Sequence, residues 1–181
     1  LICKQQSNFL RIKMCSIIGY SGKNSAAPIL VKGLQKMEYR GYDSVGIATE
    51  SENKIVVKKG VGRVVEVSNA IQLDKLPGNI GIGHTRWATH GKVTEKNAHP
   101  HSSNSGKIAI VHNGIVENFE ELKSDLQNKG YEFQSETDTE VIANLIQLNL
   151  DETSDVKQSI IKTVNQIKGH YSFVAIFDDG D

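Results

Sequence analysis

Residues Met14–Tyr20 read MCSIIGY, and this heptapeptide decides how the rest of the chain is interpreted. It is short and apolar and contains a late glycine, a pattern typical of a buried strand. Its second residue is Cys15, which becomes N-terminal if Met14 is an initiator that is removed. A terminal cysteine carries a thiol and a free α-amine with a reference pKa of about 8, so one residue supplies both a nucleophile and its base. The alternative, a cysteine packed in the core beside a methionine, stays open on this dipeptide alone.

Residues 1–13 precede this strand and have neither helix caps nor clear periodicity. We expect them to lie outside the folded domain as a non-native or unprocessed leader. A propeptide, an alternative start and upstream sequence carried along are all open explanations, and we favour the last.

Composition limits the classes of function that need to be considered. The chain has 181 residues, with 21 Lys and Arg against 21 Asp and Glu, so its formal charge is zero. Zero charge gives no support for nucleic-acid binding. Its 2 cysteines do not make a disulfide framework. No apolar stretch approaches the length of a membrane span, and the first residues do not resemble a secretion signal. We therefore predict a cytoplasmic protein.

Hydrophobic periodicity and turn residues predict the elements beyond this first strand. The first predicted helix begins near Asn24 or Ser25, with Pro28 in its first turn. The other predicted helices cover 63–71, 118–129, 137–150 and 156–167. The predicted strands cover 45–49 and 54–59 around a turn at 51–53, then 80–85, 108–112, 131–134 and 170–178. Because strands and helices do not alternate regularly, the order predicts an α+β fold rather than a doubly wound sheet.

The segment Gly83–Gly91, GHTRWATHG, concentrates polar and aromatic side chains between glycines. Arg86 suits bidentate capture of a carboxylate, and Thr89 and His90 can add hydrogen bonds. Trp87 can shield such a site from water. A loop that binds a small polar substrate and a surface loop with a half-buried tryptophan are equally open interpretations.

A second motif, Val111–Gly114, reads VHNG and ends the predicted strand. Taken alone, an Asn-Gly pair is more often a plain turn. In an enzyme, the Asn113 side-chain amide and the Gly114 backbone N–H could together stabilise a developing oxyanion.

A third motif, SETDTE at Ser135–Glu140, predicts a capping box in which Thr137 and Glu140 open a helix. Asp138 is not needed for that cap and is available for a substrate ammonium.

Six histidines invite a metal interpretation, but their spacing matches no metal motif, and we predict no metal site and no cofactor. They are His84, His90, His99, His101, His112 and His170. His99-Pro100-His101 is expected to place two rings on an extended loop.

Together, these motifs resemble the N-terminal glutaminase domain of the glutamine–fructose-6-phosphate aminotransferases, an Ntn-type, class II glutamine amidotransferase family. The matching blocks are Met14-Cys15…Gly19, EYRGYDSVG at Glu38–Gly46, GHTRWATHG at Gly83–Gly91, NAHPH at Asn97–His101, VHNGIVEN at Val111–Asn118 and SETDTEV at Ser135–Val141. The resemblance implies a four-layer αββα sandwich of two stacked, mainly antiparallel sheets.

The resemblance also implies roles for single residues. Cys15 would attack the side-chain amide of glutamine, with its own α-amine as base, and Asn113 and Gly114 would stabilise the oxyanion. The other implied roles are carboxylate binding by Arg86 assisted by Thr89 and His90, ammonium binding by Asp138, gating of ammonia by Trp87, and support of the nucleophile by the loop that contains Arg40 and Gly41.

The resemblance leaves several expectations about the extent of the protein. Residues 14–181 are expected to form a C-terminally incomplete glutaminase domain that lacks the sugar-isomerase domains. Fructose 6-phosphate would be a partner only through those missing domains. The full-length protein would be a homo-oligomer. A retained leader would block the amine of Cys15, and Ser16 stands where the family has glycine. Alternatives are the glutaminase domain of amidophosphoribosyltransferase or asparagine synthetase, and an inactive glutamine-binding fragment.

Overall fold

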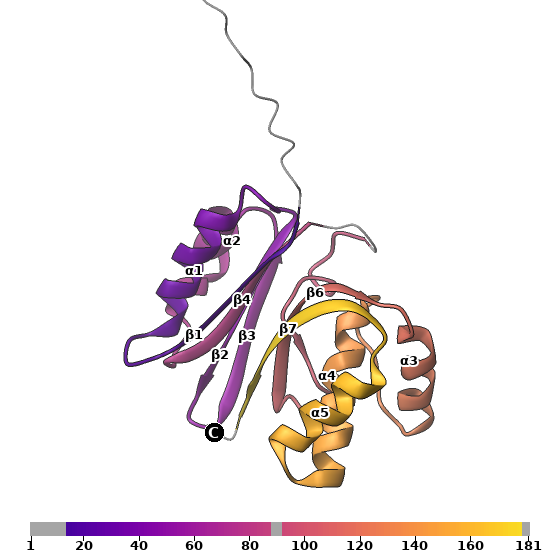
Figure 1. The fold of residues 1–181 in the computed structure, drawn as a ribbon. Helices are drawn as coiled ribbons and strands as arrows, with labels where there is room; N and C mark the ends of the chain where they lie inside the picture. The colour runs from indigo at the N-terminus through magenta and orange to yellow at the C-terminus, as the bar shows by residue number, and fades with distance from the viewer. Residues whose placement is uncertain (1–13, 88–91, 179–181) are drawn as a thin grey trace, which may run out of the picture.

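Two antiparallel sheets lie face to face in the computed structural model, which describes residues 14–87 and 92–178 (Figure 1). The first sheet has the order β1-β4-β2-β3, and the second has the order β5-β6-β7. The strands of the first sheet are β1 (Ser16–Ser21), β4 (Ile80–Arg86), β2 (Ser44–Ser51) and β3 (Lys54–Val61). Those of the second are β5 (His101–Ser102), β6 (Ile108–Val116) and β7 (Gly169–Phe177).

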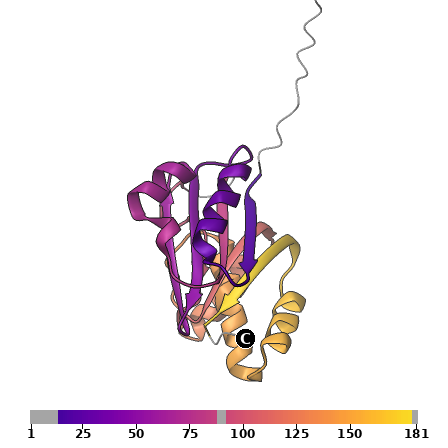
Figure 2. The ribbon, with the colours of Figure 1, turned by 90° about the vertical axis from the view of Figure 1, so that its left-hand side faces the viewer.

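Helices cover the outer face of each sheet and complete a four-layer arrangement. The first sheet is covered by α1 (Ala26–Met37), α2 (Val64–Ile71) and the 3₁₀ turn η1 (Leu73–Lys75). The second is covered by α3 (Phe119–Asn128), α4 (Asp138–Thr153) and α5 (Val156–Gln166). Figure 2 looks from the side of α1 and α2, with the first sheet behind them. The predicted α+β fold with two stacked antiparallel sheets is confirmed.

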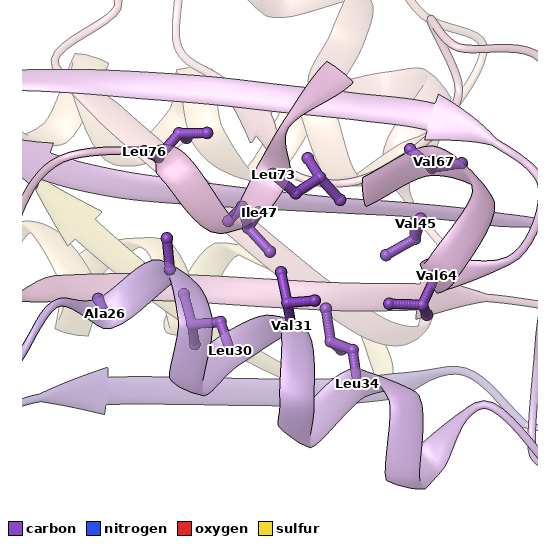
Figure 3. Close-up of a cluster of buried hydrophobic side chains, with 11 residues drawn as sticks. Ala26, Leu30, Val31, Leu34, Val45, Ile47, Val64, Val67, Leu73 and Leu76 are labelled. Atoms are coloured by element: carbon purple, nitrogen blue, oxygen red, sulfur yellow. The ribbon is translucent and has the colours of Figure 1, made fainter. Parts of the chain in front are cut away.

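The outer core of the first sheet packs α1 and α2 onto β2 (Figure 3). Leu30 and Leu34 of α1 are fully buried because glycines in β4 let the helix approach closely. A Cβ at Gly81 would lie 2.9 Å from Leu30 Cδ1, and one at Gly83 would lie 3.0 Å from Leu34 Cδ1. This packing fixes the C-terminal end of α1, from which the chain continues into the loop containing Arg40 and Gly41.

The layer between the sheets changes character along the strands. At one end, it is a small apolar cluster that includes Ile82 of β4 and Ala109 and Val111 of β6. Two residues further along β4 and β6, His84 and Asn113 replace these apolar side chains. The inter-sheet layer is therefore apolar at one end and polar at the end that contains the predicted site.

Most predicted elements are confirmed, and the β2–β3 turn uses Glu52 and Asn53 with positive φ values of 53° and 56°. Three predictions are wrong. The first strand is half-buried rather than buried, because β1 is the edge of its sheet. Residues 131–134 form no strand, since the N–H groups of Tyr131 and Gln134 donate to Leu126 O and to Glu140 Oε1.

The third wrong prediction is the capping box. Thr137 is the N-cap of α4 but makes no side-chain cap bond, and Glu140 instead accepts from Ser135 N–H at 2.7 Å and Ser135 Oγ at 2.6 Å. Across the ranges 14–87 and 92–178, no helix has the length and apolar character needed to cross a membrane.

Candidate active site

Cys15 lies immediately before β1, with its sulfur against the backbone that leaves β4. Trp87 N–H donates to Cys15 Sγ at 3.2 Å, and the thiol lies 3.5 Å from Trp87 O. Burial raises the pKa of the Cys15 thiol, while the Trp87 N–H and the Arg86 charge oppose that shift. At neutral pH, the group is therefore a thiol that needs a base before it can act as a nucleophile.

A cavity of about 300 Å³ opens beside this sulfur, at the lower end of the usual size for small-molecule sites, about 300–1,000 Å³. Its lining brings together most of the predicted site from distant parts of the chain. The predicted residues that line it are Cys15, Arg86, Trp87, Asn113, Gly114 and Asp138.

Arg86 supplies positive charge on one part of the cavity wall. It ends β4, is buried to 6% exposure, and donates from Nη1 to Lys92 O at 3.2 Å. Burial is the largest influence on its pKa and lowers it, whereas the charge of Asp138 raises it. The predicted assistants Thr89 and His90 lie outside the described residues.

Asp138 supplies the negative charge of the cavity from the first turn of α4. Its Oδ2 accepts the Val116 N–H at 2.8 Å, which fixes the carboxylate against the end of β6. Its Oδ1 lies 3.8 Å from His112 Nδ1. A cavity lined by a guanidinium and a carboxylate suits a small zwitterion such as an amino acid.

Asn113 and Gly114 stand on β6, opposite the nucleophile. Asn113 Nδ2 donates to Cys15 O at 3.2 Å. Gly114 has φ +121°, and a Cβ there would lie 2.2 Å from His170 O of β7, so only glycine fits. The Asn-Gly pair therefore lies within a strand that continues to Val116, rather than at the plain turn that the alternative interpretation requires.

Arg40, Gly41 and Ser16 lie on the other side of the nucleophile. Arg40 lines a second cavity of about 240 Å³ next to Cys15, and its carbonyl accepts the Met14 N–H at 3.0 Å. A Cβ at Gly41 would lie 3.0 Å from Trp87 N, which explains the glycine. Ser16 is buried, and its hydroxyl has no hydrogen-bond partner within the described part of the chain.

Sequence reasoning missed the group of buried imidazoles next to this cavity. His84 stacks on His99 with ring centroids 4.2 Å apart, and His99 meets His101 edge to face at 4.8 Å. Their spacing gave no metal signal, and the described residues contain no group of three or more acidic, Cys or His side chains placed to hold a metal. The loop that contains His99-Pro100-His101 is buried, and its His99–Pro100 peptide bond is cis.

A larger groove of about 1490 Å³ lies away from the nucleophile, between β3 and the loop before β5. Its lining mixes lysines and glutamates and includes none of the predicted site residues. Chemistry rather than size therefore identifies the smaller cavity as the candidate active site.

Known proteins resemble this chain over most of its length. A family model described as "Glutamine amidotransferase domain" matches residues 84–181. The chain is 52% identical to a glutamine–fructose-6-phosphate aminotransferase (isomerizing) of Pyrococcus horikoshii over 92% of its length, and 51% identical to one of Clostridium acetobutylicum over 88%. It spans only 28% and 26% of these two relatives. The resemblance inferred from the sequence motifs is confirmed.

Solved structures share the fold. The glutamine phosphoribosylpyrophosphate amidotransferase of B. subtilis, in complex with ADP and GMP, superposes with a TM-score of 0.77 at 33% identity, over 90% of this chain and 35% of that one. A structure described as the allosteric regulatory enzyme of purine biosynthesis gives 0.78 at 33% identity, with the same coverage. The Ntn-type sandwich implied by the sequence is therefore confirmed.

Proposed function

Because the chain belongs to the glutamine amidotransferase domain family, we propose that it is the ammonia-producing, glutamine-hydrolysing part of a glutamine–fructose-6-phosphate aminotransferase. The complete enzyme would make glucosamine 6-phosphate from fructose 6-phosphate and L-glutamine. The observation that carries the proposal is one cavity whose wall brings together the Cys15 nucleophile, the basic Arg86 and the acidic Asp138.

The proposed reaction begins with glutamine held by its α-groups, the carboxylate on Arg86 and the ammonium on Asp138. Cys15 Sγ attacks the side-chain amide carbon, and the thiol proton passes to the α-amine of Cys15, directly or through a water. Burial keeps the thiol protonated, which supports the need for this base. The amine then delivers the proton to the departing ammonia, and water hydrolyses the glutamyl thioester to glutamate.

We propose that Asn113 and Gly114 stabilise the negative charge of the tetrahedral intermediate. The Asn113 amide is already bonded to the Cys15 carbonyl, so it lies next to the reacting sulfur. Removing one such donor typically costs about 10²–10³ in kcat. Trp87 would close the cavity over the sulfur and gate the ammonia path, and Arg40 would support the nucleophile from the second cavity.

The second candidate is the same half-reaction in an amidophosphoribosyltransferase, which the two structural neighbours favour. The aminotransferase proposal is preferred because sequence identity is 52% for that family member against 33% for these structures. A cytoplasmic location, a homo-oligomeric full-length protein and a glutaminase domain at 14–181 remain predictions.

The test is glutamate release by a chain that starts at Met14, with removal of Met14 verified by mass spectrometry. We expect Cys15→Ala to abolish release while glutamine binding stays measurable by calorimetry, because the α-groups bind away from the sulfur. A chain that retains residues 1–14 serves as the matched control and should bind without turnover, since its Cys15 nitrogen is an amide. Release that continues undiminished in Cys15→Ala would refute the nucleophile. Failure of the unaltered, processed chain to release glutamate would favour the inactive glutamine-binding fragment.

A further inference from the structure

Four imidazoles are buried beside the proposed active site, and the proposed reaction uses none of them. They come from three segments of the chain and lie next to one another; they are His84, His99, His101 and His112. One of them, His84, reaches the proposed oxyanion-binding amide directly. Its Nε2 lies 3.0 Å from Asn113 Oδ1.

The orientation of the Asn113 amide follows from its other neighbour. The carbonyl oxygen of Cys15 can only accept a hydrogen bond, and it lies 3.2 Å from Asn113 Nδ2. The NH₂ group must therefore face Cys15, and the amide oxygen must face His84. A reversed amide would place two acceptor oxygens against each other.

An amide oxygen facing His84 in turn determines where the imidazole carries its proton. Oδ1 accepts only, so His84 Nε2 must be the protonated nitrogen. His84 Nδ1 is buried and makes no hydrogen bond of good geometry among the described residues, although the backbone of His112 acts on the pKa of the ring as a hydrogen-bond partner. The proton on Nε2 is therefore assigned from the Asn113 oxygen alone. Burial lowers the pKa of His84 to about 4, so the ring is neutral at physiological pH.

The His84 ring is also prevented from turning away. His99 stacks on it at 4.2 Å with an interplanar angle of 14°. His99 is itself held, because its Nδ1 accepts the His112 N–H at 3.3 Å. Gly46 pairs with His84 across β2 and β4, and a Cβ at Gly46 would lie 2.2 Å from His99 O. Backbone and ring packing thus hold the plane of the His84 ring.

We propose that His84, as its Nε2–H tautomer, is a positioning residue that fixes the Asn113 amide beside the reactive sulfur. One hydrogen of Asn113 Nδ2 is bonded to the Cys15 carbonyl, and the other remains for the developing oxyanion. His84 itself does not touch substrate. This inference rests on the proposed function for its catalytic consequence, whereas the tautomer and the amide orientation stand on geometry alone.

The first test measures the tautomer without any activity assay. Imidazole ¹⁵N NMR of the unaltered chain should show His84 protonated at Nε2 and unprotonated at Nδ1, with a through-hydrogen-bond or proximity signal to the Asn113 side chain. A His84 protonated at Nδ1 would overturn the proposal. This measurement gives the same answer whether or not the chain hydrolyses glutamine, so it separates failure of the inference from failure of the proposed function.

The second test measures coupling between the two residues in the processed, active chain. We expect His84→Leu to lower kcat about 10- to 100-fold, which does not exceed the fall in kcat when an oxyanion donor is removed. KM should stay within about twofold of its original value. His84→Gln retains an N–H donor and should recover most of the loss. In an Asn113→Ala background, His84→Leu should have almost no further effect on kcat.

His101→Leu is the matched control, because His101 is equally buried and contacts His99, but bonds to Thr137 Oγ1 rather than to Asn113. Its effect should be the same with and without Asn113→Ala. A His84→Leu effect that is also independent of Asn113→Ala would reduce His84 to a packing residue and refute the positioning role. If His84→Leu does not fold, the His84→Gln variant and the tautomer measurement decide the question.

Discussion

At the scale of single residues, the site depends on carboxylates that sequence reasoning could only partly assign. The capping box predicted for Glu140 left Asp138 unengaged, yet both side chains bind backbone. Glu140 accepts the N–H groups of Gln134 and Ser135, and Asp138 accepts that of Val116. A hydrogen bond to a residue 22 positions away cannot be read from a local motif, because it exists only once β6 and α4 have docked.

Asp138→Asn separates the charge of this residue from its structural bond. The asparagine oxygen can still accept the Val116 N–H, so the fold should survive. We expect KM for glutamine to rise about 10- to 100-fold, the value of a charge-assisted hydrogen bond, with kcat within about threefold. Steady-state glutamate release measures both constants.

Glu117→Gln is the control for this variant, since Glu117 is an exposed carboxylate on the wall of the same cavity. It should leave KM nearly unchanged. An equal rise of KM in both variants would point to general charge in the cavity, and a fall of kcat without a change of KM would remove the ammonium-binding role from Asp138.

At the scale of elements, β3 holds the loop that supplies the buried histidines. Lys59 Nζ donates to Ala98 O at 2.7 Å and to Pro100 O at 3.1 Å, and also to Lys96 O at 3.3 Å. Burial lowers the pKa of Lys59 to about 8. Three carbonyl acceptors therefore stabilise the Lys59 ammonium, whereas burial destabilises it. The difference between these two free energies decides how much Lys59 stabilises the fold.

We expect the three hydrogen bonds to outweigh the burial of charge, so Lys59→Met should lower the free energy of unfolding by about 2 kcal/mol or more. Urea denaturation followed by circular dichroism measures this. Lys58→Met is the matched control one residue earlier, where Nζ donates to a single carbonyl, Ile71 O, at 2.8 Å. It should cost about 1 kcal/mol. A Lys59→Met chain more stable than the unaltered one would mean that charge burial dominates.

Sequence periodicity predicted the long helices and strands well. It failed where backbone N–H groups bond to tertiary partners instead of to a neighbouring strand. The helices α1, α3, α4 and α5 follow their apolar spacing, and a polar turn correctly predicts the β2–β3 hairpin. The strand predicted at 131–134 failed because a carboxylate from α4 accepts its backbone N–H at Gln134. The two-residue strand β5 is too short to show any period, so pattern alone could not predict it.

At the scale of the whole molecule, the two sheets are joined by an apolar cluster at one end and by imidazoles and an amide at the other. Sequence motifs offered Cys15, Arg86, Asn113 and Asp138 as candidates, and the resemblance to a family supplied their predicted roles. They could not identify His84 as a partner of Asn113, since that contact requires two sheets to stack with β4 over β6. The four predicted residues line one cavity, and His84 contacts one of them, Asn113, across the interface between the two sheets.

This interface should make the fold sensitive to acid. The pKa of His84 is about 4 in the folded protein, against an ordinary value of 6.5, because burial disfavours the imidazolium. The unfolded chain therefore binds the proton first, and stability that is fully present above pH 6.5 falls as the pH is lowered toward 4. His84 alone should account for about 3 kcal/mol at pH 4, and burial also lowers the pKa values of His99, His101 and His112.

Urea unfolding between pH 7 and pH 4 measures this loss, and variants separate it from the titration of carboxylates. His84→Gln should flatten the dependence, because glutamine takes up no proton. Curves that coincide for His84→Gln and the unaltered chain would contradict the assignment.

The half-buried sulfur of Cys15 has a pharmacological consequence. Covalent inhibitors that rely on a pre-ionised thiolate meet a protonated sulfur sheltered by Trp87. A warhead on an amino-acid scaffold would instead be delivered to it by the opposite charges of Arg86 and Asp138. Selectivity in such compounds should therefore come from the scaffold, and increasing the electrophilicity of the warhead should mainly add reaction with other thiols.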